Sequence, residues 1–245
     1  MVIVFPNTIN FQPNLEEFKE KITPRTKAVI INSPNNPTGV IYSEATIIKL
    51  SEILREKQSE FGTDIYLVSD EPYRELAYDN AKVPYLSKYY ENTIIGYSFS
   101  KSLSLPGERI GYLVIPNQVA DYEDIISAAN IANRILGFVN APSLFQRVVA
   151  KCLNAKIDLE TYNRNRELLY KGLSSYGSTN VLNPKVRFTC LLKLLLRMML
   201  NSAIWPRRRT FSLFLALYLA ARVMFELPIV SLIIKLRKHC RTLRH

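Results

Sequence analysis

Short runs of β-branched residues alternate, in the first half of the chain, with segments whose apolar residues recur at helical spacing. The stretch KAVIINSPNNPTG is typical of a buried strand that ends in a turn. Ser43 then begins a predicted helix with Ile47, Leu50 and Leu54 on one face, and Gly62 ends it. Three further strands are predicted in DIYLVSDEPY, NTIIGYSFSK and RIGYLVIP. The alternation predicts an α/β fold with a mostly parallel sheet flanked by helices.

After Pro116 the apolar spacing is helical throughout. Segments 118–135, 143–153 and 157–177 are predicted helices, the last ending near Gly172 or Gly177. Together with a change of composition near residue 185, this predicts three parts. They are a sheet core in 1–116, a helical part in 117–184 and a tail in 185–245.

Residues 186–245 carry the whole net charge of +11. Residues 1–185 hold equal numbers of basic and acidic residues, whereas residues 186–245 hold 12 Lys and Arg and a single acid, Glu226. All eight glycines precede the tail. A role in nucleic-acid binding is not predicted, because no fold signature or aromatic pattern accompanies the basic stretch PRRRT.

Cys152, Cys190 and Cys240 are odd in number and widely spaced. This pattern favours a reduced, cytoplasmic protein, and it offers no metal-ligand spacing, so no metal site is predicted. The opening MVIVFPNTINF lacks a basic region followed by a long apolar stretch, so no secretory signal is predicted.

Polar residues follow the predicted strands, where ligands of parallel sheets bind. Asn36 follows the first strand, Asp70 and Tyr73 the second, and Ser98 and Lys101 the third. Arg109 comes shortly afterwards. Taken singly, NPTG is also a common turn, an aspartate here can cap a helix, and most lysines lie at the surface. Together these groups suit a cofactor with a pyridine nitrogen, a phenolic oxygen, an aldehyde and a phosphate.

The stretches NNPTG, SDEPYRE and SFSKSLSLPGERIG resemble the signatures of the class I/II pyridoxal-phosphate-dependent aminotransferases, which have the aspartate aminotransferase fold. They occur in the order and at the spacing of that family, and the resemblance covers about residues 1–185. It implies an incomplete large domain, pyridoxal 5′-phosphate as cofactor, amino acid and 2-oxo acid substrates, and a homodimer. It also implies transfer of an amino group between the two substrates.

The resemblance further implies the role of each residue. Lys101 would bind the cofactor aldehyde covalently and move a proton at the substrate Cα. Asp70 would pair with the pyridine nitrogen, while Tyr73 and Asn36 would bond the phenolic oxygen. Ser98 and Arg109 would hold the phosphate. The expected catalytic residues are Lys101, Asp70 and Tyr73, and the expected cofactor-binding residues are Asn36, Asp70, Tyr73, Ser98, Lys101 and Arg109.

Two parts of the family pattern are not recognisable in the chain. One is an upstream glycine-rich phosphate loop with an aromatic residue that stacks on the pyridine, and the other is a C-terminal small domain with an arginine for the substrate carboxylate. We therefore expect little or no activity from this chain. Alternative functions are a lyase of the same fold that acts on an amino-acid side chain, or a non-catalytic remnant.

We interpret the tail as the family's small domain read in a shifted frame. Permitted codons for 186–191 and the two residues that follow, read one base earlier, encode Gly-Ala-Phe-Tyr-Leu-Phe-Val-Lys, which resembles the start of that domain. Sequencing the DNA around the codon for Val186 tests this interpretation. The alternative interpretation is a membrane-associated tail in 211–236, but Arg222, Glu226 and Pro228 within it would be costly in lipid. A membrane partner is therefore not expected.

Overall fold

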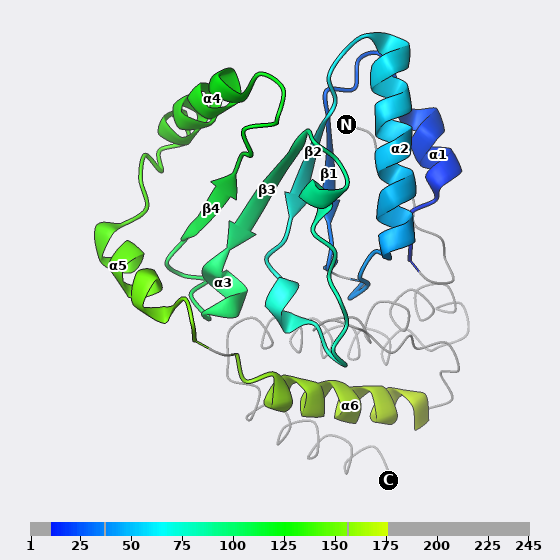
Figure 1. Ribbon diagram of the computed structural model, residues 1–245. Helices are drawn as coiled ribbons and strands as arrows, with labels where there is room; N and C mark the ends of the chain where they lie inside the picture. Colours follow the sequence, from blue (N-terminus) through cyan, green and yellow to red (C-terminus); the bar gives the residue numbers. More distant parts are fainter. Residues whose placement is uncertain (1–10, 37, 156, 176–245) are drawn as a thin grey trace, which may run out of the picture. The chain divides into compact units, whose positions relative to one another are not determined.

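Three parallel strands and one antiparallel strand form a single sheet in the order β1-β2-β3-β4 (Figure 1). The computed structural model describes residues 11–36, 38–155 and 157–175, all of which belong to one of the two units of the chain. The strands are β1 Ala28–Asn32, β2 Tyr66–Asp70, β3 Thr93–Ser98 and β4 Gly111–Val114. The predicted mostly parallel α/β sheet is thus confirmed.

The helix between β1 and β2 begins and ends where the local sequence signals predict. Helix α2 spans Glu44–Phe61, and the Ser43 side chain accepts a hydrogen bond from the amide of Thr46. Gly62 ends the helix in the left-handed conformation at φ 61°, which glycine adopts without a steric penalty. Ile47, Leu50 and Leu54 are all buried on one face, as expected.

The remaining helices include those predicted after Pro116. Helix α6 continues through Gly172, so the predicted end at that residue is wrong, and the alternative end at Gly177 lies outside the described residues, as does the predicted tail. The α-helices are α1 Leu15–Lys21, α3 Phe99–Ser102, α4 Tyr122–Ile135, α5 Ser143–Cys152 and α6 Leu159–Ser175, and the 3-10 helices are η1 Arg74–Leu76 and η2 Leu86–Lys88.

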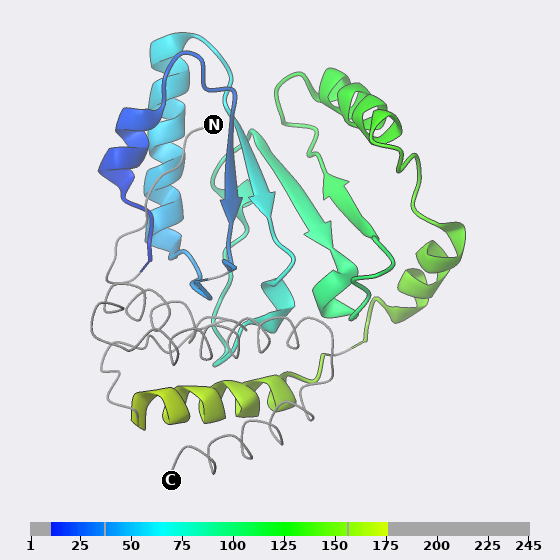
Figure 2. The same ribbon diagram turned by 180° about the vertical axis from the view of Figure 1, so that it is seen from behind.

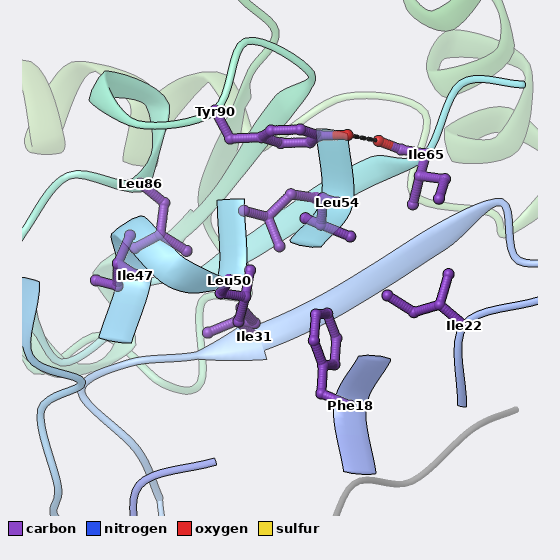
Figure 3. Close-up of a cluster of buried hydrophobic side chains, with 10 residues drawn as sticks. Phe18, Ile22, Ile31, Ile47, Leu50, Leu54, Ile65, Leu86 and Tyr90 are labelled. Atoms are coloured by element: carbon purple, nitrogen blue, oxygen red, sulfur yellow. Dashed lines mark hydrogen bonds between the residues drawn. The ribbon is translucent and has the colours of Figure 1, made fainter. Parts of the chain in front are cut away.

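The main core joins α1 and α2 to the first two strands (Figure 3). Phe18 of α1 and the apolar face of α2 meet Ile31 of β1 and Leu67 of β2. Tyr90 closes this cluster, and its phenol donates a hydrogen bond of 2.7 Å to the carbonyl of Ile65, so the buried hydroxyl is satisfied. This packing fixes α2 against the strands whose ends carry the predicted site residues.

A second, smaller cluster consists of Tyr73 and Leu76, with Ile41, Ile157, Leu159 and Tyr162 packed against them. Its members come from the turn after β1, the segment after β2 and the start of α6. The cluster therefore brings α6 to the segment that follows Asp70.

Within the described part of the chain, no helix combines the length and the apolar character that crossing a bilayer requires. The apolar stretch 211–236 lies outside that part. Among the same residues, no group of His, Cys, Asp and Glu side chains could hold a metal ion.

Candidate active site

The ends of the three parallel strands lie at the same edge of the sheet, and β4 runs the opposite way (Figure 2). Asn32 of β1 is level with Asp70 of β2, which is level with Gly96 of β3. Because β4 is antiparallel, its first residue, Gly111, pairs with Ser98 at the end of β3. One edge of the sheet therefore carries the predicted site.

Asn32 links the ends of β1 and β2 through its side chain. Its Nδ2 donates to both the main-chain oxygen and Oδ2 of Asp70, each at 3.0 Å. Its Oδ1 accepts from the amide of Asn36 at 2.8 Å. Asn32 is not among the residues predicted from the sequence, although its place as the last residue of the strand AVIIN, shortly before NNPTG, indicates a position near the site.

Tyr73 brings two other predicted residues together. Nδ2 of Asn36 donates to its phenol oxygen at 3.0 Å, and Nζ of Lys101 lies 5.5 Å from the centre of its ring. Tyr73 is only 7 % exposed and belongs to the second cluster, so its ring is held by packing. An ammonium at this distance from an aromatic face is attracted by the ring quadrupole.

Asp70 has one carboxylate oxygen engaged and one available. Oδ2 accepts from Asn32, whereas Oδ1 accepts no hydrogen bond from the described residues. Partial burial raises the pKa of the Asp70 carboxyl above its ordinary value of 3.8, and the neighbouring Glu71 charge raises it further. The Asn32 hydrogen bond lowers the pKa and so favours the carboxylate.

Lys101 lies on the short segment between β3 and β4, just after Ser98. Ser98 ends β3 and caps α3, because its Oγ accepts from the amide of Ser100 at 3.2 Å. The same hydroxyl lies 2.7 Å from Oγ of Ser100, to which it donates. Lys101 stands within α3, three residues after this cap.

Arg109 is not bonded to the other five predicted residues. It is exposed, its φ is 52°, and its Nη1 donates to the carbonyl of Pro106 at 2.8 Å. The structure therefore brings Asn36, Tyr73 and Lys101 into contact and ties Asp70 to Asn36 through Asn32. It places Arg109 on the same connection as Lys101 without joining their side chains.

Behind the site, a buried ion pair anchors the segment that follows Asp70. Oε2 of Glu71 accepts from Nε and Nη2 of Arg74 at 2.8 and 2.6 Å, and Oε1 accepts from Ser69 at 2.7 Å. Arg74 also donates to the carbonyls of Val83 and Pro84. Because both charged groups are fully engaged, the turn between Asp70 and Tyr73 is held in one conformation.

The chain matches known proteins over most of its described length. Residues 2–202 match the family described as aminotransferase class I and II, and that match continues past residue 185. An aspartate aminotransferase of Pyrococcus horikoshii is 32 % identical over 181 residues, which are 73 % of this chain and 44 % of the relative. A probable aspartate/prephenate aminotransferase of Aquifex aeolicus is also 32 % identical, over 73 % of this chain and 45 % of the relative.

Solved structures give the same result. The crystal structure of an amino transferase from Eubacterium rectale is 51 % identical, with a TM-score of 0.69 over 71 % of this chain and 44 % of that one. A mutant aspartate aminotransferase of Thermus thermophilus is 30 % identical, with a TM-score of 0.60 over 72 % of this chain and 47 % of that one. The chain spans less than half the length of these relatives, and it belongs to the class I and II aminotransferases, a pyridoxal-phosphate-dependent family.

Proposed function

We propose that this chain forms the pyridoxal-phosphate-binding part of an aminotransferase that moves an amino group from an amino acid to a 2-oxo acid. The observation that carries the proposal is a continuous series of contacts at one sheet edge. Asp70 bonds Asn32, Asn32 bonds Asn36, Asn36 bonds Tyr73, and the Tyr73 ring lies beside the Lys101 amine.

The polar side chains at this edge of the sheet suit the chemical groups of the cofactor. Asp70 offers Oδ1, an acceptor with no hydrogen bond among the described residues, to a protonated ring nitrogen. The Asn36 amide and the Tyr73 phenol, already 3.0 Å apart, are two donors suited to one phenolic oxygen. Lys101 supplies the one amine among the six predicted residues, 5.5 Å from the centre of the Tyr73 ring, and an amine is the group that binds an aldehyde covalently.

Pyridoxal phosphate, when bound, supplies an aldehyde that captures amines and a ring that withdraws electrons from the substrate Cα. Lys101 would hold the cofactor and, once released by the incoming amino acid, accept the proton from Cα and deliver it again. The Tyr73 ring beside it would keep the amine oriented toward the reacting carbon.

Asp70 would keep the ring nitrogen protonated through a charge-assisted hydrogen bond. The Asn32 bond to Oδ2 favours the ionised carboxylate that this role requires. Tyr73 and Asn36 would stabilise negative charge on the phenolic oxygen. Ser98 would donate its hydroxyl to the phosphate, and Arg109 would exchange its bond to Pro106 for two bonds to the same group.

The further expectations follow from the family. The parts 1–116, 117–184 and 185–245 would be the cofactor-binding core, the helical part of the large domain, and a tail in place of the small domain. The parent enzyme would act as a homodimer in the cytoplasm. That this chain has weak activity or none stays a prediction.

Reduction with borohydride tests the proposal. The purified chain is mixed with pyridoxal phosphate, reduced, digested and analysed by mass spectrometry, with Lys101→Ala and the exposed Lys88→Ala as matched variants. We expect a reduced cofactor on the Lys101 peptide of the wild type and of Lys88→Ala. Modification that persists in Lys101→Ala, or that spreads over surface lysines, contradicts the proposal.

A second step separates the reaction types. Amino acid alone is added to the complex with no oxo acid present. A transaminase converts the bound cofactor to pyridoxamine phosphate, whereas a lyase releases a cleaved product and leaves the cofactor unchanged. A non-catalytic remnant shows no cofactor that borohydride can fix at Lys101.

A further inference from the structure

Arg166 of α6 makes a two-pronged ion pair with a residue 87 positions earlier in the chain. Its Nη1 and Nη2 donate to the two carboxylate oxygens of Asp79 at 2.9 and 3.1 Å. The guanidinium also lies over the ring of Tyr78, 4.7 Å from its centre. The Arg166 side chain is only 5 % exposed, so the pair is shielded from water and salt on that side.

Asp79 stands in a tight turn that the ion pair holds. The amide of Ala81 donates to the carbonyl of Tyr78 at 3.0 Å, and both central residues, Asp79 and Asn80, have positive φ of 57° and 52°. Aspartate and asparagine tolerate this left-handed backbone better than other side chains, but it is still uncommon. The Arg166 guanidinium therefore binds a turn whose backbone has few other conformations available.

The same face of α6 touches the site. Tyr162 precedes Arg166 by four residues, which places the two on one face of the helix. Tyr162 packs against the cluster formed by Tyr73 and Leu76, as does Leu159 from the start of α6. Helix α6 is therefore attached to the segment that follows Asp70 at two points. One is the ion pair at the turn, and the other is the packing at Tyr73.

We infer that Arg166 is a positioning residue, which holds α6 on the turn at Asp79 so that Tyr162 keeps the Tyr73 phenol against Asn36 and the Tyr73 ring beside Lys101. The contacts described for Arg166 are those with Asp79 and Tyr78, and its effect on Tyr73 is transmitted through helix α6. The role at the cofactor rests on the proposed function, whereas the effect on the Asn36–Tyr73 bond does not.

The test compares Arg166→Lys, which keeps the charge but loses the planar fork, with Arg164→Lys, an exposed position on the same helix. The protein is labelled with ¹⁵N-asparagine, and the side-chain amide signal of Asn36 is followed by NMR without cofactor. We expect the signal in Arg166→Lys to move toward its position in Tyr73→Phe, and to stay unchanged in Arg164→Lys. Asp79→Asn, which tolerates the turn, serves as a second variant if Arg166→Lys does not fold.

The second readout uses the complex with pyridoxal phosphate. The pH midpoint of its visible absorbance change is expected to rise in Arg166→Lys and in Asp79→Asn, because a displaced Tyr73 stabilises the phenolic anion less well. An unchanged Asn36 signal, or a shifted signal with an unchanged midpoint, overturns the inference. If the wild type binds no pyridoxal phosphate, the proposed function fails, and the NMR measurement alone decides the role of Arg166.

Discussion

The side-chain amide of Asn36 donates a hydrogen bond of 3.0 Å to the phenol oxygen of Tyr73. The two residues come from the turns after adjacent parallel strands, 37 positions apart in the sequence. Their bond defines the centre of the proposed site.

Because the two groups hold each other in place, their removal is expected to be non-additive. Tyr73→Phe and Asn36→Ala should each weaken binding of pyridoxal phosphate about tenfold, as the loss of one hydrogen bond typically does. The double variant should bind little more weakly than either single one. Absorbance titration gives the dissociation constants, and fully additive losses would show that the pair does not act together.

Asn32→Ala is expected to destabilise the fold more than a surface asparagine does. It removes two bonds to Asp70 and one from the Asn36 amide, so the free energy of unfolding should fall by about 2 kcal/mol. Asn133→Ala is the matched control, because that exposed side chain makes one bond, to Val139. Urea unfolding measures both variants, and equal losses would refute a special role for Asn32.

Asp70 is expected to make the free energy of unfolding depend on pH, with higher stability at low pH. Burial raises its pKa in the folded state above the ordinary 3.8, so the folded protein binds this proton more tightly than the unfolded chain. The stabilisation of the folded state by this carboxyl group is complete below pH 3.8, and it is lost as the pH rises through the pKa of the folded state. Cofactor binding has the opposite dependence, because it requires the carboxylate.

The measurement is urea unfolding of the wild type and Asp70→Asn between about pH 3 and pH 7. The difference between the two should change in this range and level off above it. A difference that is flat with pH contradicts the assignment of a raised pKa.

The buried pair Glu71–Arg74 should be far more sensitive to substitution than an exposed pair. Arg74→Met leaves the Glu71 carboxylate, 3 % exposed, without its partner, and should cost about 3 kcal/mol or more. Arg55→Met breaks the pair with Glu91, whose side chains are 47 % and 45 % exposed, and should cost less than about 1 kcal/mol. Adding Glu71→Gln to Arg74→Met should restore part of the loss. Urea unfolding checks all three, and similar costs at the two pairs would contradict the argument.

The fold could be predicted where the determining contacts are local. Ser43 and Gly62 mark the ends of α2 by backbone chemistry within a few residues, and each predicted strand is a short apolar run next to a turn. The antiparallel direction of β4 could not be predicted, since its short connection to β3 is compatible with several paths. Of the two ends predicted for α6, the one at Gly172 was wrong, because a single glycine costs a helix only about 1 kcal/mol, and the one at Gly177 lies outside the described residues.

The site could be predicted in its residue types but not in its connections. Asp70 stands at the end of a strand, and Asn36, Tyr73 and Lys101 stand after strand ends, which the sequence indicates. The part played by Asn32 depends on the register of β1 against β2, and the pair Arg166–Asp79 joins segments far apart in the chain. Such contacts are set by the packing of whole elements, so no local pattern reveals them. The cofactor roles of the six residues stay predictions.

The antiparallel direction of β4 determines how far the connection from β3 to β4 extends. A parallel fourth strand would have to begin at the opposite border of the sheet, about 15 to 20 Å away for strands of this length. The chain would then leave the neighbourhood of Lys101 at once. Because β4 instead begins at Gly111, beside Ser98, the twelve residues between them turn back on themselves. Lys101 and Arg109 therefore lie on one short loop.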